Sequence, residues 1–194
     1  MPVFAITGNI CSGKSSLLFF LKKMGAIVFD ADKKVHQYYS DKESIVYKKI
    51  KKYFPLVFVN NRIVRKKLLK LVLDDNKKLQ LLEKIVHPII MKDLKKWIAQ
   101  TKKTDKIAVA EVPLLFEKKL ENCFDGVIIL NVNENILLNR IQKKYKISKA
   151  EAIRRLKLFL PIEEKIKKAN FVIENNKDIK NLYKEAKNLW EKIC

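Results

Sequence analysis

Cysteine, glycine and arginine are scarce in this chain of 194 residues. The three cysteines are odd in number and lie far apart, at Cys11, Cys123 and Cys194, and the chain has only two histidines. These counts support neither a disulfide framework nor a structural zinc site. No run approaches the roughly 18 apolar residues of a membrane-spanning helix, and the first residues lack the charged start and apolar stretch of a secretory signal. We therefore expect a soluble, cytoplasmic protein with no membrane partner.

Acidic residues are half as numerous as basic ones, 21 against 42, which gives a formal net charge of +21. Such an excess suggests a nucleic acid or an anionic membrane surface as partner. Only five of the basic residues are arginine, however, and the lysines are spread over nearly every segment. This pattern favours a compositional bias on solvated faces over a dedicated polyanion surface. We expect no specific nucleic-acid partner.

Two of the four glycines, Gly8 and Gly13, lie in the stretch GNICSGKSS, residues 8–16. This stretch stands between an apolar run and a helical pattern. In that context, loop amides and the helix N-terminus bind phosphate, Lys14 adds charge at the β- and γ-phosphates, and the Ser15 hydroxyl ligates Mg²⁺. The alternative is a glycine-capped turn with a solvated lysine, which the flanking strand and helix disfavour. We assign ATP binding in this loop to Gly8, Asn9, Ile10, Cys11, Ser12, Gly13, Lys14, Ser15 and Ser16.

One residue of this loop, Cys11, is chemically unusual. Its predicted position beside a helix N-terminus and Lys14 is a setting that lowers the pKa of a thiol. We therefore expect Cys11 to be alkylated faster than Cys123 or Cys194 and to be shielded by ATP.

Apolar runs alternate with helical patterns along the chain, which predicts an α/β fold with a parallel five-stranded sheet and helices on both faces. Further helices are expected at 134–145, at 148–158 and at the C-terminus. Residues 33–103 are polar-rich and helical, with breaks predicted at Pro55, at 60–62 and at 87–88. The five expected strands lie within residues 2–7, 26–32, 106–117, 125–131 and 170–175.

A GTPase is disfavoured, because the nearest candidate for a guanine-binding Asn-Lys-x-Asp signature, at residues 176–179, places its aspartate one residue early. A small-molecule kinase is favoured instead. Such kinases carry an acceptor-binding helical insertion after the second strand and an arginine-bearing lid.

The chain resembles the dephospho-coenzyme A kinase family from about residue 3 to residue 176. Singly, only the phosphate loop is a strong signal, but the order and spacing of the matching elements are specific. These are TGNICSGKSS (7–16), FDAD (29–32), Arg65, VHP (86–88), EVPLLFE (111–117), Arg140, Arg155 and KKANFVIEN (167–175). The chain differs from the usual family pattern at Phe159 (glutamine), Asn170 (aspartate) and Asn61 (glycine).

The resemblance implies a P-loop kinase that transfers the γ-phosphate of ATP to the ribose 3′-hydroxyl of dephospho-CoA, with Mg²⁺ as cofactor. It implies a nucleotide-binding core, a helical acceptor-binding region and a small helical lid. We place the core at 1–32, 104–139 and 168–194, the acceptor-binding region at 33–103 and the lid at 140–167. The substrates would be ATP and dephospho-CoA, and we expect a monomer or a weak homo-oligomer.

Asp32 is the candidate for accepting or orienting the proton of the attacking hydroxyl. It ends the second predicted strand, at the carboxyl edge of the sheet where α/β folds bind ligands. The alternative is a helix N-cap, since aspartate is a favoured residue there. Asp30 is interpreted as structural or as associated with the metal through water.

Arg140 resembles the lid arginine that reaches the phosphates of ATP, so we assign it to ATP binding and to catalysis. Lys14 and Asp32 are the other two residues assigned to catalysis. Arg155 is assigned to ATP binding as well. The alternative for both arginines is an exposed ion pair on a helix, worth only a few tenths of a kcal/mol.

Acceptor binding is assigned to Asp32, Arg65, His87, Pro113, Leu114 and Leu115. The alternatives are a surface cation for Arg65, a helix-ending cap for His87 and a plain core edge for Pro113–Leu115. Glu111 is a candidate for a water-mediated contact to Mg²⁺.

Two rival functions remain open at this point. The first is another P-loop kinase that acts on a nucleoside or a nucleotide. The second is a basic ATPase associated with nucleic acid, which would bind duplex or RNA with a steep negative salt dependence.

Overall fold

A computed structural model describes residues 1–194. The chain forms two compact units, unit 1 with residues 1–30 and 98–194 and unit 2 with residues 31–97. Residues 140–167, which the sequence assigns to a lid, belong to unit 1. Each unit is described by itself below.

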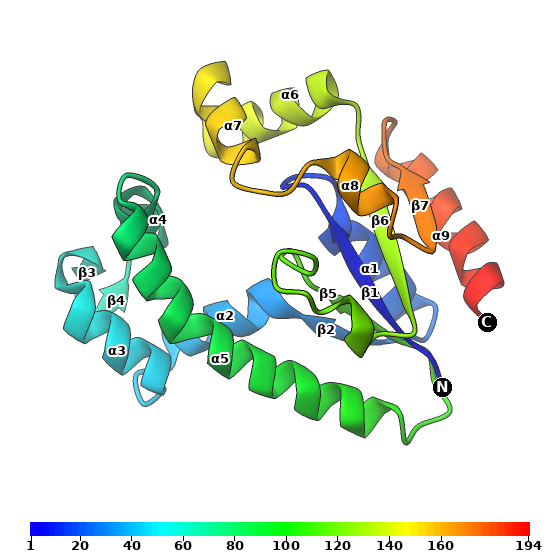
Figure 1. The fold of residues 1–194 in the computed structure, drawn as a ribbon, viewed down its shortest axis with the longest axis horizontal. Helices are drawn as coiled ribbons and strands as arrows, with labels where there is room; N and C mark the ends of the chain where they lie inside the picture. The colour runs from blue at the N-terminus through cyan, green and yellow to red at the C-terminus, as the bar shows by residue number, and fades with distance from the viewer. The chain divides into compact units, whose positions relative to one another are not determined.

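Unit 1 is built on a parallel five-stranded sheet in the order β2-β5-β1-β6-β7, which confirms the predicted fold class. β1 is the central strand, so its carboxyl end lies in the middle of one sheet edge (Figure 1). That edge is where open α/β sheets bind ligands. The strands are β1 (Val3–Gly8), β2 (Ile27–Asp30), β5 (Ala108–Glu111), β6 (Gly126–Asn131) and β7 (Phe171–Glu174).

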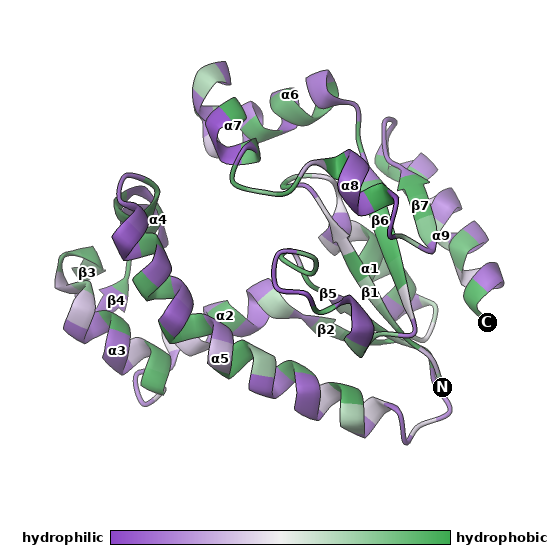
Figure 2. Cartoon of the chain, viewed as in Figure 1, coloured by the Kyte–Doolittle hydropathy of each residue, from purple (hydrophilic) through white to green (hydrophobic).

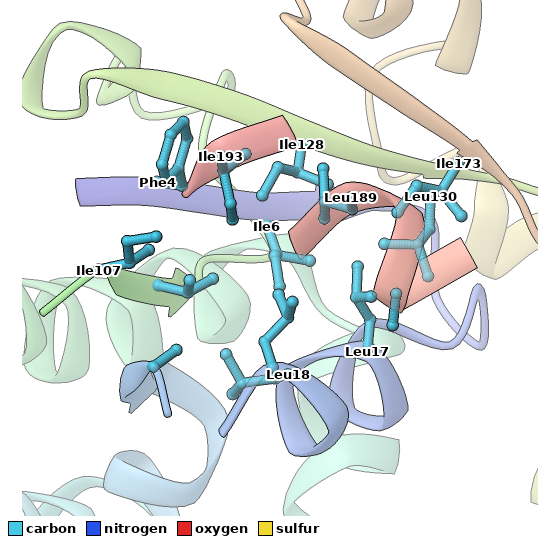
Figure 3. Close-up of a cluster of buried hydrophobic side chains, with 14 of the residues drawn as sticks. Phe4, Ile6, Leu17, Leu18, Ile107, Ile128, Leu130, Ile173, Leu189 and Ile193 are labelled. Carbon is cyan, nitrogen blue, oxygen red and sulfur yellow. The ribbon is translucent and has the colours of Figure 1, made fainter. Parts of the chain in front are cut away.

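The largest core cluster lies between the sheet and the helices α1 (Lys14–Lys23) and α9 (Ile179–Ile193). Figure 3 shows Ile6 of β1 between leucines of α1 and the side chains of α9. All six residues of β1 are buried, and α8 (Ile162–Ile166) packs on the neighbouring strand β6 from the other face of the sheet. Figure 2 shows the result as apolar strands between helices that carry one polar face. A central strand covered on both sides needs a continuous apolar run, which is the pattern from which it was predicted.

Helix α1 ends in a Schellman motif at Gly25. The Gly25 N–H donates to the carbonyl of Lys22, and the Ala26 N–H donates to that of Leu21. Gly25 has a φ of 115°, which only glycine adopts without strain. The motif turns the chain directly into β2.

Two further helices of unit 1, α6 (Glu134–Tyr145) and α7 (Lys149–Leu156), confirm their predictions. Their N-caps are Asn133 and Ser148, whose side chains accept from the N–H groups of the first turns. A second core cluster holds the two helices together, and Ile10 and Cys11 of the phosphate loop pack against it. A 3₁₀ turn, η2 (Glu121–Cys123), precedes β6.

Unit 2 is mostly helical. Its helices are α2 (Ala31–Ser40), α3 (Ile45–Tyr53), α4 (Arg65–Leu73) and most of α5 (Asn76–Thr101), with a 3₁₀ turn η1 (Pro55–Val57). A small hairpin, β3 (Phe58–Val59) with β4 (Arg62–Ile63), was not predicted. Even α5, the longest helix with 26 residues, is no candidate to cross a bilayer, and neither is any other helix.

The turn of the hairpin accommodates one of the departures from the family pattern. Asn60 and Asn61 both have positive φ, 48° and 56°, as a two-residue hairpin turn requires. Asparagine tolerates this region better than other non-glycine residues. The Tyr47 hydroxyl donates to the Asn61 carbonyl at 2.6 Å, which holds the turn against α3.

The predicted break at His87-Pro88 is wrong, because α5 runs through Pro88 without interruption. Proline removes one N–H from the helix ladder. A buried stripe at a spacing of four residues, formed by Val86, Ile90, Leu94 and Ile98, continues on both sides of the proline. Burial of this stripe outweighs the lost hydrogen bond, and the stripe was the sequence signal for a continuous helix.

Leu17 tests how much α1 depends on the core, since it is 0% exposed and lies three residues after Lys14. Leu17→Ala removes buried methyl groups and leaves a cavity, so we expect the free energy of unfolding to fall by about 2–5 kcal/mol. Urea denaturation followed by circular dichroism measures it. Phe19→Ala is the control on the same helix, because Phe19 is 53% exposed; an equal loss in both variants would contradict the assigned packing.

Candidate functional site

The loop between β1 and α1 folds back on itself through three residues with positive φ. These are Gly8 at 138°, Cys11 at 61° and Gly13 at 102°. A Cβ on Gly8 would lie 2.7 Å from the carbonyl oxygen of Leu130 in β6, so the loop approaches the sheet as closely as glycine permits. The amides of Ile10, Cys11 and Gly13 donate to no protein acceptor. They are therefore available to an anion.

Lys14 crosses this loop with its ammonium group. The Nζ atom donates to the carbonyls of Asn9 at 2.9 Å and Gly8 at 3.2 Å. The residue is only 7% exposed. A lysine held in this way places its charge at the mouth of the loop, where the first turn of α1 adds its own positive end.

Ser15 and Glu111 meet at the carboxyl edge of the sheet. The Ser15 hydroxyl donates to Glu111 Oε1 at 3.2 Å, and Asp30 of β2 stands opposite Glu111 in the strand register. Hydroxyl and carboxylate oxygens are the ligands that Mg²⁺ prefers, usually one or two from the protein with the rest from phosphate and water. The chain has no cluster of three metal-binding side chains. The residues thus fit a magnesium ion that binds together with a nucleotide.

Sequence reasoning missed Asn175, which lies directly after β7. Its Nδ2 atom donates to the Ser12 carbonyl at 2.7 Å in the buried wall of the loop. The contact spans 163 positions of sequence, so no local pattern reveals it. The available signal was its place at the carboxyl end of a predicted strand, beside the edge that holds the loop.

The prediction of a low pKa for Cys11 is wrong. Burial raises the pKa of the Cys11 thiol above its usual value, and the positive charges of Lys144, Lys14 and Arg140 offset that effect only in part. The reason is the contact of Cys11 with the apolar cluster of α6 and α7, which removes the thiol from water.

Arg140 and Arg155 lie on α6 and α7 in different surroundings. Arg140 is half-buried and donates from Nη2 to the Lys177 carbonyl at 3.2 Å, in the segment after β7. Arg155 is largely buried, donates from Nε to Glu151 Oε1 at 3.1 Å and lies 5.0 Å from the centre of the Tyr145 ring. Burial would raise the pKa of Glu151, but its hydrogen bonds to Arg155 and Arg154 hold that pKa below its usual value.

Sequence reasoning also missed the role of Glu117, which binds the segment that follows α7. Glu117 Oε1 accepts from Lys165 Nζ at 2.7 Å and from the Leu160 N–H at 3.1 Å. Lys165 has almost no exposed surface, and its ammonium lies 5.6 Å from the centre of the Phe159 ring. Phe159, one of the departures from the family pattern, therefore packs against a buried ion pair.

Asn170, another departure from the family pattern, does not lie at the carboxyl edge of the sheet. Asn170 precedes β7, and its Oδ1 accepts from the Val127 N–H at 2.8 Å near the start of β6. In a parallel sheet the starts of the strands lie at the edge opposite their carboxyl ends. Asn170 thus joins two strands at the far edge, where an aspartate oxygen would accept the same hydrogen bond.

Asp32 lies in the first turn of α2, the second residue of a helix that begins at Ala31. The alternative interpretation as an N-cap is wrong, because the cap precedes the first helical residue. Burial, together with the negative charge of Asp32, raises the pKa of Tyr39 to about 12, and Arg65 opposes this effect. Asp32 and Arg65 therefore both act on Tyr39 within unit 2.

Unit 2 contains a cavity of about 710 Å³ whose lining includes Arg65. Arg65 Nη1 donates to His36 Nε2 at 2.6 Å. Other lining residues supply cations and rings, namely Lys42, Arg62, Tyr39 and Tyr47. The cavity is thus positively charged and partly aromatic.

The remaining predicted acceptor residues lie elsewhere. His87 is not in the cavity lining, and its Nδ1 is 4.0 Å from Glu83 Oε2 on the same helix. Leu115 is 0% exposed and supports the segment after β5 from within the core. Pro113 and Leu114 are partly exposed, and the Pro113 carbonyl accepts from the Thr7 hydroxyl at 3.3 Å.

Comparison with known proteins gives a consistent result. A model of the dephospho-CoA kinase family matches residues 2–181. A dephospho-CoA kinase from Fusobacterium nucleatum subsp. nucleatum is 35% identical over 192 residues, which cover 98% of either chain.

Solved structures agree with the sequence relatives. The crystal structure of TT1252 from Thermus thermophilus has a TM-score of 0.78 and 30% identity, and the match covers 100% of this chain and 98% of that one. A dephospho-CoA kinase from Campylobacter jejuni has a TM-score of 0.68 and 27% identity, with 99% and 97% covered.

The corrected state of Cys11 changes the expected order of alkylation. The thiolate is the reactive form, and a raised pKa lowers its fraction near neutral pH. We expect iodoacetamide to modify the exposed Cys194 faster than Cys11, as followed by mass spectrometry of the digested protein. The urea-unfolded chain is the control, in which the two rates become similar. Faster modification of Cys11 in the folded protein would contradict its burial.

Proposed function

Because the chain belongs to the dephospho-CoA kinase family, we propose which of its residues carry out the reaction of that family. The protein is an ATP-dependent transferase that phosphorylates the ribose 3′-hydroxyl of dephospho-CoA, giving CoA and ADP in coenzyme A biosynthesis. The roles of single residues below are the proposal. The observation that carries it is the cradle of residues 8–15, with available amides and the Lys14 ammonium at its mouth.

The loop binds the phosphates of ATP. Phosphoryl transfer needs in-line positioning and neutralisation of charge more than covalent chemistry from the protein. The amides of Ile10, Cys11 and Gly13 and the N-terminus of α1 hold the phosphates in place. When ATP binds, the Lys14 ammonium group exchanges its hydrogen bonds to the carbonyls of Gly8 and Asn9 for contacts to the β- and γ-phosphates.

Ser15 and Glu111 hold magnesium with the nucleotide. The Ser15 hydroxyl would be a direct ligand, and Glu111 would orient the hydroxyl or a bound water, in line with their contact at 3.2 Å. When bound, the ion neutralises phosphate charge. Asp30, opposite Glu111 in the sheet, adds negative charge to the same edge.

Asp32 prepares the acceptor for attack. Its carboxylate accepts the proton of the 3′-hydroxyl while the oxygen forms a bond to the γ-phosphorus. The bond from that phosphorus to the β–γ bridging oxygen breaks, and ADP leaves. Asp32 suits this role because it is exposed in the first turn of α2 and stands two residues after the carboxyl end of β2.

The cavity of unit 2 binds the diphosphate and the rings of dephospho-CoA. Arg65 and Arg62 offer planar forks that match phosphate oxygens, which lysine does less well. Tyr39 and Tyr47 offer surfaces for apolar and aromatic parts of the acceptor. Pro113, Leu114 and His87 are further acceptor contacts, and Leu115 supports the first two from the core.

The helices α6 and α7 close over the nucleotide as a lid. Arg140 exchanges its hydrogen bond to the Lys177 carbonyl for one to the phosphates. Arg155 needs a larger change, because it must leave Glu151 before it binds ATP. Mg²⁺, the cytoplasm as location and a monomer or weak homo-oligomer remain predictions.

Acceptor specificity tests the proposal against a general nucleotide kinase. We expect ADP release with Mg-ATP and dephospho-CoA, and at most background release with AMP or adenosine. A coupled assay of ADP formation with each acceptor in turn measures this. Equal rates of ADP release with AMP and with dephospho-CoA would contradict the proposal and indicate a nucleoside monophosphate kinase.

Asp32→Asn tests the role of the carboxylate. The amide cannot accept the proton, so kcat should fall by about 10²–10⁴-fold while the Kd for Mg-ATP is unchanged. Asp41→Asn is the matched control on the segment after α2, since asparagine also accepts the hydrogen bond from the Glu43 N–H. Unchanged kcat in Asp32→Asn would exclude a base at this position.

A further inference from the structure

We propose that Asn175 is a positioning residue that orients the phosphate loop for nucleotide binding by holding the Ser12 carbonyl away from the phosphate site. The inference rests on the proposal that residues 8–15 bind the phosphates of ATP. Asn175 would not touch ATP or the acceptor in this role. It acts through a single peptide group of the loop.

The position of Asn175 is determined by the sheet. Its backbone N–H donates to the Asn131 carbonyl at 2.8 Å and extends the contact between β6 and β7 by one residue. The residue is 5% exposed, and its Nδ2 donates to the Ser12 carbonyl at 2.7 Å. A donor carried by a strand end and surrounded by protein has little freedom to move, so it holds the loop in one orientation.

The geometry of the peptide bond transmits this contact to the inside of the loop. The chain has no cis peptide bond, and in a trans peptide the C=O of one residue and the N–H of the next point in opposite directions. Because the Ser12 carbonyl points toward Asn175, the Gly13 N–H points away from it. That N–H donates to no protein acceptor. Asn175 thus directs the Gly13 amide to where an anion binds.

Gly13 and Asn175 also fit each other in space. A Cβ on Gly13 would lie 2.3 Å from Nδ2 of Asn175, closer than real Cβ contacts allow. Gly13 is therefore required for the close approach of the amide as well as for its φ of 102°. Gly13, the second glycine of the motif, and Asn175, far away in the sequence, therefore depend on each other for this contact.

The chemistry of the contact requires a neutral donor. An aspartate has the same shape, but its carboxylate would place an acceptor against the Ser12 carbonyl and a negative charge behind a loop that receives a triphosphate. Only a protonated carboxyl group would restore the hydrogen bond. This difference between two side chains of equal size separates a donor role from a role in filling space.

Calorimetric titration with Mg-ATP and with dephospho-CoA tests the inference in wild type, Asn175→Ala and Asn175→Asp. For Asn175→Ala we expect the Kd for Mg-ATP to rise about tenfold or more, the effect of one lost buried hydrogen bond on the site. The Kd for dephospho-CoA should be unchanged. Asn170→Ala is the control, because it removes a side-chain contact to the backbone at the other end of β7. It should lower the melting temperature without changing the Kd for Mg-ATP.

The pH dependence of Asn175→Asp decides the matter even where Asn175→Ala fails to fold. Its Kd for Mg-ATP, divided by the wild-type value at each pH, should be large at pH 8 and fall toward one as the pH is lowered to about 5.5 and the carboxyl group protonates. A ratio that does not change with pH, or an Asn175→Ala variant that folds and binds Mg-ATP like wild type, would overturn the inference. Failure of wild type to bind Mg-ATP would instead overturn the proposed function.

Discussion

The orientation of a few peptide groups between β1 and α1 is the constraint on which the rest of the structure depends. Carbonyls on one side of the loop are occupied by protein donors, Lys14 for Gly8 and Asn9 and Asn175 for Ser12. Amides on the other side keep their hydrogens for a ligand. The sheet supports this arrangement, because β1 is central, β5 beside it ends at Glu111, and β7, beyond β6, ends next to Asn175 at the same edge. The amides are thus oriented before charge arrives, and within the loop only Lys14 has to exchange its carbonyl partners for the phosphates in the proposed role.

Much of the fold follows from the sequence, because most strands and helices of unit 1 have a strong local signal; the short α8 (Ile162–Ile166) was not predicted. The buried strands are continuous apolar runs, and α6 and α7 begin after residues that cap helices. The break at Pro88 was predicted wrongly, because proline usually interrupts a helix, whereas the longer apolar stripe of α5 keeps this helix continuous. The hairpin of β3 and β4 was not predicted, because strands of two residues are too short to show an alternating pattern. Of the site, the contiguous loop was recognisable, whereas Asn175 and Glu117 depend on partners far away in sequence.

The helices α6 and α7, which we propose to be the lid, share one apolar cluster with the loop between β1 and α1. Ile10 and Cys11, at the tip of the loop, pack against the residues that join α6 to α7. This contact gives a physical reason for two apolar residues in a loop that binds a charged ligand. In the proposed lid role, a movement of α6 and α7 that changes this packing would change the loop, and by thermodynamic reciprocity a ligand in the loop would change the equilibrium of these helices to the same extent.

The burial of two ammonium groups has a practical consequence for a protein so rich in lysine. Lys14 and Lys165 are the buried lysines of the chain, whereas most of the others stand on its surface. Reagents that couple to amines, such as activated esters used for biotinylation or immobilisation, will react with the outer lysines first. The enzyme can therefore be attached to a surface at many points while the amine at its nucleotide loop stays intact.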